Sequence, residues 1–334
     1  MRVGKITENA LKRSVLKQIR TEYKGIESAA VGTDCAFSNE KKTFSAIYPV
    51  TEDISDPGLF AVMKAANSLI AQGIKPDHVT LSILLPADAE EKELKKIVAD
   101  ALTACKMCGT VYGGGHSEVT TIVTKALVTA TATGIQGNCE MKPGPIQEKS
   151  LNNLFQKPRA GQSLVITKWI ALEGTAMIAA EKKNELSTRY PVPFIEKAES
   201  FKALLDIREE ARIIAGFDGV SVHDISSGGV FAALWEMAQR AGCGLNVELK
   251  KIPLRQETIE ICEFFELNPY EILSGGSLLI ATNEPEALAG ALQAEGIPAA
   301  LVGRLVQGND KIIINDDERR FLELPQSDEI HKIL

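Results

Sequence analysis

Three consecutive glycines at positions 113–115 are the sequence feature that most constrains how this chain can fold. A helical pattern precedes them, a polar cluster follows at 116–118, and a long β-branched run occupies 122–133. Glycine adopts backbone conformations that other residues avoid, so the run predicts a sharp turn whose backbone comes close to a neighbouring group. Exposed amides in such a turn can bind anions, although most glycine-rich loops are only turns. By itself the segment leaves phosphate binding and a plain turn both open.

The composition excludes several classes of protein. A length of 334 residues fits about two domains, and the net charge of −7 with 5% aromatic residues argues against nucleic-acid binding. No apolar run is long enough to cross a membrane and the N-terminus lacks a signal peptide, so we expect a cytoplasmic chain. Six cysteines are too few for a disulfide framework, and the lone pair Cys105 and Cys108 lacks further zinc ligands.

Strand and helix signals alternate along both halves of the chain, which predicts an α/β protein. Asp56 and Pro57 mark one helix start, and Asp88 with Glu91 marks another. In the first half we expect strands at 43–47, 79–85 and 122–133, and helices at 57–73 and from 88 to the glycine run. In the second half we expect strands at 163–167, 245–249, 277–281, 299–306 and 311–315, and helices at 174–181, 196–215 and 230–240.

Residues 138–161 differ from the rest of the chain. They are rich in Pro, Gly, Gln, Lys and Asn and show little periodicity, which is typical of an interdomain linker or a long loop. We therefore expect an N-terminal domain over 1–145, a linker over 146–160 and a C-terminal domain over 161–325.

A second glycine-containing turn, from Asp224 to Gly229, precedes the helical pattern at 230–240. The first amides of a helix are unpaired and lie at the positive end of its dipole, so this turn is a candidate anion site. A helix start capped by Ser226 or Ser227 explains the same residues, and the local pattern alone favours the cap.

Several segments, taken in order, resemble the AIR synthase superfamily, and within it the branch of the hydrogenase maturation protein HypE. Each segment alone is a weak signal, but their order from residue 4 to about 306 makes the resemblance specific. The segments are Val31-Gly32-Thr33-Asp34-Cys35-Ala36-Phe37, Pro49-Val50-Thr51, Ala66-Asn67-Ser68-Leu69, Gly73-Ile74-Lys75-Pro76, Gly114-Gly115-His116-Ser117-Glu118-Val119, Thr167-Lys168-Trp169, Leu172-Glu173-Gly174-Thr175, His223-Asp224-Ile225-Ser226-Ser227-Gly228-Gly229 and Ser274-Gly275-Gly276-Ser277-Leu278.

The resemblance implies a two-domain α/β (α+β) fold of the PurM-like type. In this fold the N-terminal sheets of two copies pair into a barrel, and the C-terminal domain is an α/β sandwich. It also implies ATP along a cleft near the dimer interface, with Mg²⁺ held by N-terminal aspartates. Members of the family use ATP to phosphorylate a carbonyl-type oxygen, and a nucleophile or an elimination then displaces the phosphate. The implied partners are a second copy, a nucleotide and, for a maturation factor, another protein.

The chain departs from the family pattern where the metal would bind. Thr33, Tyr48 and Ser68 stand where the family has acids, and His116 follows the glycines where many members have aspartate. Asp34 is the one clear survivor of the metal cluster. We therefore expect weakened magnesium binding, because hard carboxylates are the ligands that Mg²⁺ prefers.

Acids near the departures are candidates to replace the missing ligands, namely Glu52, Asp53 and Glu118. We expect a nucleotide phosphate between the glycines at 113–115, Asp34 and Lys5. The pair Lys168 and Glu173 fits a plain surface pair. The candidate catalytic residues are Asp34, His116 and Asp224, and the candidate nucleotide-binding residues are Lys5, Asp34, Asn67, Gly113, Gly114, Gly115, His116, Ser117, Glu118, Ser227, Gly228 and Gly229.

Three functions are compatible with these residues. The first is an ATP-dependent enzyme that activates a carbonyl- or carbamoyl-type oxygen on an unidentified substrate. The second is a nucleotide- or partner-binding accessory dimer that has lost catalysis, which the missing acids favour, and the third is a purely structural oligomer. The last cysteine is Cys262, so we expect none of the C-terminal thiolate chemistry that the resemblance to HypE implies.

Overall fold

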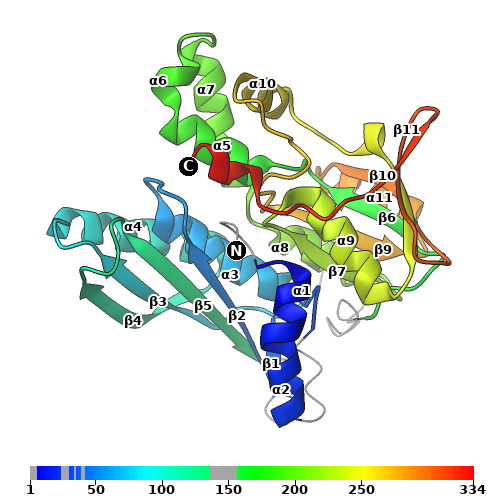
Figure 1. Ribbon diagram of the computed structural model, residues 1–334, viewed down its shortest axis with the longest axis horizontal. Coiled ribbons are helices and arrows are strands. Elements are labelled where there is room, and N and C mark those ends of the chain that lie inside the picture. Colours follow the sequence, from blue (N-terminus) through cyan, green and yellow to red (C-terminus); the bar gives the residue numbers. More distant parts are fainter. Residues whose placement is uncertain (1–5, 24–29, 34, 39–41, 136–155) are drawn as a thin grey trace.

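The computed structural model describes residues 6–23, 30–33, 35–38, 42–135 and 156–334. Two sheets with their own helices form two units, one from each half of the chain (Figure 1). The expected two-domain α+β architecture is therefore confirmed, while the barrel between two copies stays a prediction. None of the helices in the described part of the chain combines the length and apolarity that a membrane crossing requires.

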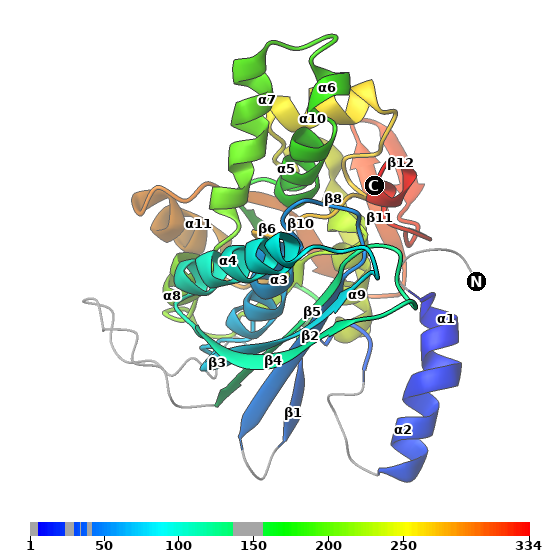
Figure 2. The ribbon, with the colours of Figure 1, turned by 90° about the vertical axis from the view of Figure 1, so that its left-hand side faces the viewer.

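The N-terminal sheet has five strands in the order β1-β2-β5-β3-β4. Strands β3 and β4 pair in parallel, and the other neighbours pair antiparallel. Alternate residues of β3 and β5 are buried, so one face of the sheet packs on the core, against the helices α3 and α4 seen above it in Figure 2. The elements are β1 Ala36–Ser38, β2 Thr43–Val50, α3 Pro57–Ile70, β3 His78–Leu85, α4 Glu91–Cys108, β4 Val111–Val119 and β5 Leu127–Ile135.

Helix α3 is the central element of the molecule. Every residue of α3 except Ser68 is buried, because the helix packs on β2 and β5, on α4, and on α8 and β7 of the second unit. A helix buried all round normally carries only apolar residues, yet α3 contains Lys64 and Asn67. These two polar residues therefore need partners within the protein.

The C-terminal sheet has seven strands in the order β12-β11-β8-β10-β6-β9-β7. Strand β9 lies between β6 and β7, and all six of its residues are buried. Its elements are β6 Ser163–Thr167, α5 Leu172–Glu181, α6 Lys183–Leu186, α7 Val192–Glu199, η3 Ser200–Leu204, α8 Arg208–Ile214, β7 Ser221–Ile225, α9 Gly229–Ala241, β8 Gly244–Glu248, η4 Leu249–Lys251, α10 Gln256–Phe264, β9 Ser277–Thr282, α11 Pro285–Ala294, β10 Ala299–Val306, β11 Lys311–Asn315, β12 Glu318–Phe321 and η5 Glu329–Lys332.

A short helical segment precedes the first sheet and packs on the second unit. It consists of α1 Glu8–Leu11, the π-helical turn η1 Lys12–Leu16 and α2 Lys17–Glu22. The indole Nε1 of Trp235 on α9 donates a hydrogen bond of 2.9 Å to the carboxylate of Glu8. This bond joins the start of the chain to α9.

The glycines at 113–115 form part of a strand, so the prediction of a sharp turn is wrong. They lie in β4, and the pairing of β4 with β3 shifts register between Val79 and Thr80. Gly115 has a φ of +146°, and a Cβ on it would lie 1.9 Å from the carbonyl oxygen of Leu81. Close approach to β3 at a bulge therefore explains Gly115 without any ligand.

Other elements also differ from the sequence predictions. The strand expected at 122–133 begins at Leu127, and the capping box of α4 is formed by Glu90 and Glu93 instead of Asp88 and Glu91. The single helix expected at 196–215 is three pieces, α7, η3 and α8. The break between η3 and α8 has a local cause, because Lys168 Nζ donates to the carbonyl oxygens of Leu204 and Asp206 there.

The bulge predicts that alanine at Gly115 and alanine at Gly113 lower the free energy of unfolding by different amounts. Gly115→Ala should destabilise the protein by about 2 kcal/mol or more, because its Cβ would collide with the backbone of β3. Gly113→Ala is the matched control, since its Cβ would meet only the side chain of His78, at 3.3 Å. Urea denaturation of both variants measures the difference. Equal losses in the two variants would contradict this account of the strand.

Candidate functional site

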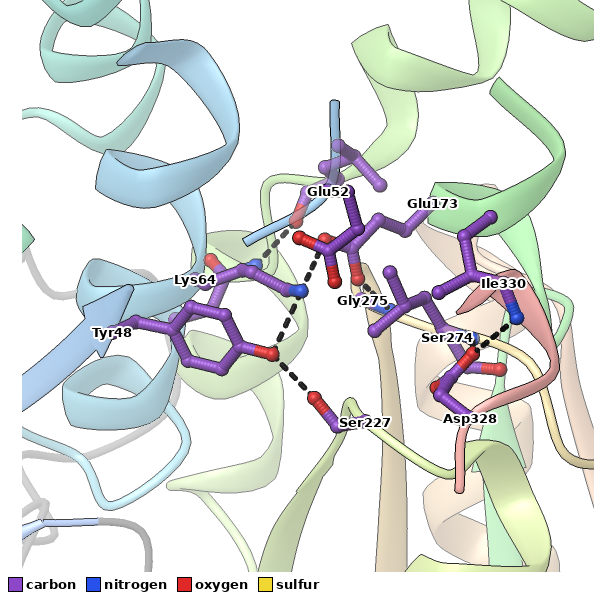
Figure 3. Close-up of polar contacts among 12 residues, drawn as sticks. Tyr48, Glu52, Lys64, Glu173, Ser227, Ser274, Gly275, Asp328 and Ile330 are labelled. Atoms are coloured by element: carbon purple, nitrogen blue, oxygen red, sulfur yellow. Dashed lines mark hydrogen bonds and ion pairs between the residues drawn. The ribbon is translucent and has the colours of Figure 1, made fainter. Parts of the chain in front are cut away.

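The candidate site is the junction where α3 meets α5 and the loop between β7 and α9. Its centre is the ammonium of Lys64, which lies 2.9 Å from the Glu173 carboxylate on α5. Both side chains are almost fully buried, with 3% and 1% of their surfaces exposed. Because Lys64 comes from the first unit and Glu173 from the second, this ion pair joins the two units (Figure 3).

Tyr48 on β2 continues the polar network across the junction. Its hydroxyl accepts a hydrogen bond of 2.9 Å from Lys64 and also bonds the hydroxyl of Ser227, in the loop before α9. The ammonium of Lys64 additionally lies 4.1 Å from the centre of the Tyr48 ring. Tyr48 therefore connects three chain segments that are distant in the sequence, and Figure 3 shows its ring pointing into the junction.

The electrostatics of the junction keep Lys64 charged. Burial by itself lowers the pKa of Lys64, but the nearby Glu173, together with Tyr48 and Glu52, outweighs burial and raises that pKa well above its usual value. Burial raises the pKa of Glu173, and the charge of Lys64 and the amide of Gly275 act against it. The junction therefore contains a permanent cation close to two carboxylates, those of Glu173 and the buried Glu52.

The Asp224–Gly229 turn lies at this junction, as its sequence suggested. The Ser68 hydroxyl contacts the Asp224 carboxylate at 3.5 Å, so a second pair joins α3 to the end of β7. Neither Ser226 nor Ser227 caps α9, because the N-cap is Gly228, whose φ is +79°. The predicted serine cap is therefore wrong.

An anion does bind the start of α9, but it belongs to the chain itself. The Asp328 carboxylate accepts a hydrogen bond of 2.6 Å from the amide of Gly228, and others from the amides of Leu273 and Ile330. Burial raises the pKa of Asp328, and these amides partly offset that rise. The amide of Gly228, which the sequence offered to a phosphate, is thus already bonded to a side chain of the C-terminal segment.

The candidate residues of the N-terminal unit are spread widely. Asn67 is buried in α3 and donates a hydrogen bond of 2.7 Å to the carbonyl oxygen of Leu205. His116 and Glu118 are exposed on β4 and form a pair of 3.1 Å with each other. Asp53 forms a surface ion pair with Lys125. The candidates that β4 carries along its exposed length are Gly113, Gly114, Gly115, His116, Ser117 and Glu118.

Lys5 and Asp34 lie outside the described residues, so the structure does not test the predicted phosphate position between them and the glycines. Strands β1 and β4 are the two opposite edges of the N-terminal sheet. The glycines of β4 are therefore separated from β1 by the width of the sheet within one chain.

Lys168 and Glu173 do not form the surface pair that the sequence suggested. Lys168 is buried and pairs with Glu210 at 2.6 Å, while Glu173 pairs with Lys64. Sequence reasoning missed Lys64 as a site residue. One signal was available, since a lysine at 64 stands within the apolar pattern of the 57–73 helix, where a solvent-exposed lysine would not be expected.

A divalent metal has few ligands in the described structure. No group of three or more His, Cys, Asp or Glu side chains among the described residues is arranged to hold a metal ion. Tyr48 and Ser68 supply hydroxyls at the junction, and the cation there is Lys64. The described part of the junction therefore offers hydroxyls and the separate carboxylates of Glu52 and Asp224, without a preformed group of three metal ligands.

Comparisons with known proteins give one consistent family. Residues 17–136 match the model of the AIR synthase related protein N-terminal domain, and residues 159–315 match that of its C-terminal domain. Carbamoyl dehydratase HypE of Rhodobacter capsulatus is 28% identical over 285 residues, which cover 83% of this chain and 77% of the relative.

Solved structures agree on the fold. A chain of the HypE-HypF complex superimposes with a TM-score of 0.73 and 17% identity, covering 93% of this chain and all of that one. Hydrogenase maturation protein HypE in complex with ATP gives a TM-score of 0.69 at 15% identity, with coverage of 98% and 97%.

The buried ion pair predicts a large and pH-dependent effect of removing its cation. Lys64→Met should destabilise the protein by about 3–5 kcal/mol at neutral pH, because Glu173 is left buried without its partner. Protonation removes the uncompensated charge, so the deficit relative to the parent should shrink as the pH falls towards the pKa of Glu173 in that variant. Urea denaturation across a pH series measures both effects.

The double variant Lys64→Met/Glu173→Gln is the matched control. It should recover much of the lost stability, because no unpaired charge remains in the junction. A single variant that is as stable as the parent, with no pH dependence of the difference, would contradict the assignment of a buried ion pair.

Proposed function

Because the chain belongs to the AIR synthase related family, we propose that it is an ATP-binding, HypE-like protein. The fold that it shares with the ATP complex of HypE supports a nucleotide role. The specific role that the geometry supports best is a nucleotide-binding accessory factor with little dependence on magnesium. The observation that carries this choice is the hydrogen bond at the domain junction between the Lys64 ammonium and Tyr48. Tyr48 stands at a position where the resemblance places an acid.

Contacts of two of the replaced residues support this choice. Tyr48 contacts Ser227 and Ser68 contacts Asp224, both in the second unit. Both residues also bond Lys64, Tyr48 through the ammonium and Ser68 through the carbonyl oxygen, so the two substitutions belong to one network. The ammonium of Lys64 would oppose a divalent cation placed here, although the carboxylates of Glu173 and Glu52 offset part of its charge. The hydroxyls of Tyr48 and Ser227 would supply hydrogen bonds to nucleotide phosphates near the junction.

The carboxylates that remain at the junction favour the enzyme as a second candidate function. Asp224 and Glu52 are both buried there. An enzyme of this kind would use ATP to activate a carbonyl- or carbamoyl-type oxygen of an unidentified substrate. Asp224, or Glu52, Asp53 or Glu118 in place of the missing acids, would then bind the phosphate-bridging magnesium.

We keep the phosphate position proposed from the sequence, at the β4 glycines, Asp34 and Lys5, with one addition. Since β4 and β1 are opposite edges of one sheet, we propose that the β4 glycines of this site come from a second copy. The proposed homodimer would provide this arrangement, with the nucleotide near the interface.

The first test separates the two functions. We expect the parent protein to bind ATP with nearly equal affinity in Mg²⁺ and in EDTA, and to hydrolyse it weakly or not at all. Isothermal titration and a phosphate-release assay measure these properties. Robust magnesium-dependent hydrolysis would contradict the accessory role and favour the enzyme, and absence of ATP binding in both buffers would refute the nucleotide role.

Replacing Thr33, Tyr48 and Ser68 with acids should restore magnesium binding. The triple variant Thr33→Asp/Tyr48→Asp/Ser68→Asp is expected to bind ATP at least about tenfold more tightly with Mg²⁺ than without it, because three carboxylates return. The matched control is Thr33→Asn/Tyr48→Asn/Ser68→Asn, which has the same shape without the charge. Equal magnesium dependence in the two triple variants would contradict a loss of metal binding through these positions.

The homodimer also has a direct test. Ile47 on β2 is 69% exposed and Val111 on the edge strand β4 is 63% exposed, so the N-terminal sheet offers an apolar surface and an unpaired edge. Sedimentation at micromolar concentration should show a dimer, and Ile47→Lys should shift it to a monomer. Ile259→Lys, on the exposed side of α10, should leave the dimer intact. A monomeric parent protein would refute the dimer.

A further inference from the structure

A cavity of about 750 Å³ lies at the opposite end of α9 from the domain junction. Gln239 and Arg240, near the C-terminus of α9, form one wall, and the helical segment η1–α2 forms another. Helix α9 is 13 residues long, or about 20 Å at 1.5 Å per residue. The cavity is therefore separate from the network around Lys64, although Thr33, at a position where the resemblance places an acid, is also in its lining.

Five cationic side chains line this cavity, which we call the basic cavity: Lys12, Lys17, Arg20, Lys157 and Arg240. No acidic residue is among the described residues that line it, although the whole chain has a net charge of −7. Such a concentration of one sign of charge in a concave surface attracts ions of the opposite sign.

Helical spacing places these cations together. Lys12, Leu16 and Arg20 recur every four residues, so they lie along one side of the N-terminal helical segment. Leu16 is buried, and the bond between Glu8 and Trp235 holds the segment against α9. The cationic face is thereby fixed towards the cavity.

Ordinary structural roles account for only part of this charge. Arg20 and Arg240 stand in the last turns of α2 and α9, where a cation stabilises the helix dipole. Lys12 forms an ion pair with Glu8. Neither role explains why Lys17 and Lys157, from separate parts of the chain, line the same cavity.

We propose that the basic cavity binds a small polyanion, through two or more phosphate groups of a phosphorylated molecule. A volume of about 750 Å³ is in the range of small-molecule sites, and a concave surface suits a compact ligand better than an extended nucleic acid. The guanidinium of Arg240 is oriented by the carbonyl oxygens of Val222 and Gln156, at 3.5 and 3.4 Å. Guanidinium and ammonium groups together give charge-assisted hydrogen bonds to phosphate oxygens.

Tripolyphosphate is the probe for the test, titrated into the full chain by calorimetry at low and at moderate salt. The parent protein should bind it, with an affinity that falls as salt rises. Lys17→Gln/Arg20→Gln should weaken binding at least about tenfold, because two charge-assisted contacts are lost. Both side chains are exposed, so the variant should stay folded, which its melting curve checks.

Lys95→Gln/Lys250→Gln is the matched control, since it removes two exposed lysines that do not line the cavity. It should bind tripolyphosphate like the parent. No binding by the parent, or equal binding by all three proteins, would overturn the proposal.

Competition with ATP identifies the source of the phosphates. If ATP displaces tripolyphosphate from the parent, and does so less well from Lys17→Gln/Arg20→Gln, the cavity accepts a nucleotide. If ATP does not displace it, the cavity accepts a different phosphorylated molecule, and the proposal stands in both cases. The result is independent of the proposed function, because tripolyphosphate binding can depend on the basic cavity even if the junction binds no ATP.

Discussion

The buried ion pair between Lys64 and Glu173 is the interaction on which the arrangement of the two units depends. A charge transferred from water into the protein interior costs several kcal/mol unless a partner compensates it. Lys64 lies on a helix that is buried all round, and its partner comes from the other unit. Either unit alone would therefore leave its charged side chain exposed to solvent or buried without a partner. The pair ties the position of α3 to that of α5, and the contacts of Tyr48 and Ser68 follow from that position.

The ion pair helps to explain why Tyr48 can stand where the resemblance places an acid. An isolated loss of acids would leave a cavity, or unpaired amides and hydroxyls, at the metal position. Here the Tyr48 hydroxyl bonds both Lys64 and Ser227, so the substitution at 48 is joined to a cation on α3. A covalently attached ammonium supplies positive charge without coordination geometry and without a need for several carboxylates. Internal hydrogen bonds therefore occupy the position where the resemblance places an acid.

Sequence patterns predicted the elements whose signals are local. Strands β6, β10 and β11 have the predicted bounds, and α3 begins at the predicted Pro57, because apolar runs and helix caps depend on a few neighbouring residues. The glycines at 113–115 were misread, since the same residues suit a turn and a bulged strand, and only the approach of Leu81 decides between them. The partner of the Gly228 amide lies 100 residues away in sequence, at Asp328. No local pattern indicates a contact of that kind.

The two ends of α9 show how one helix can separate two kinds of anion contact. At its N-terminus, where the helix dipole favours negative charge, the Gly228 amide is bonded to the chain's own Asp328 carboxylate. At its C-terminus the dipole opposes an anion, so attraction there must come from side chains. Arg240 and the lysines of the basic cavity supply that charge. The N-terminus of α9, which the helix dipole makes favourable for an anion, is therefore already occupied by the Asp328 carboxylate. An external polyanion is favoured at the C-terminus instead, where cationic side chains outweigh the dipole.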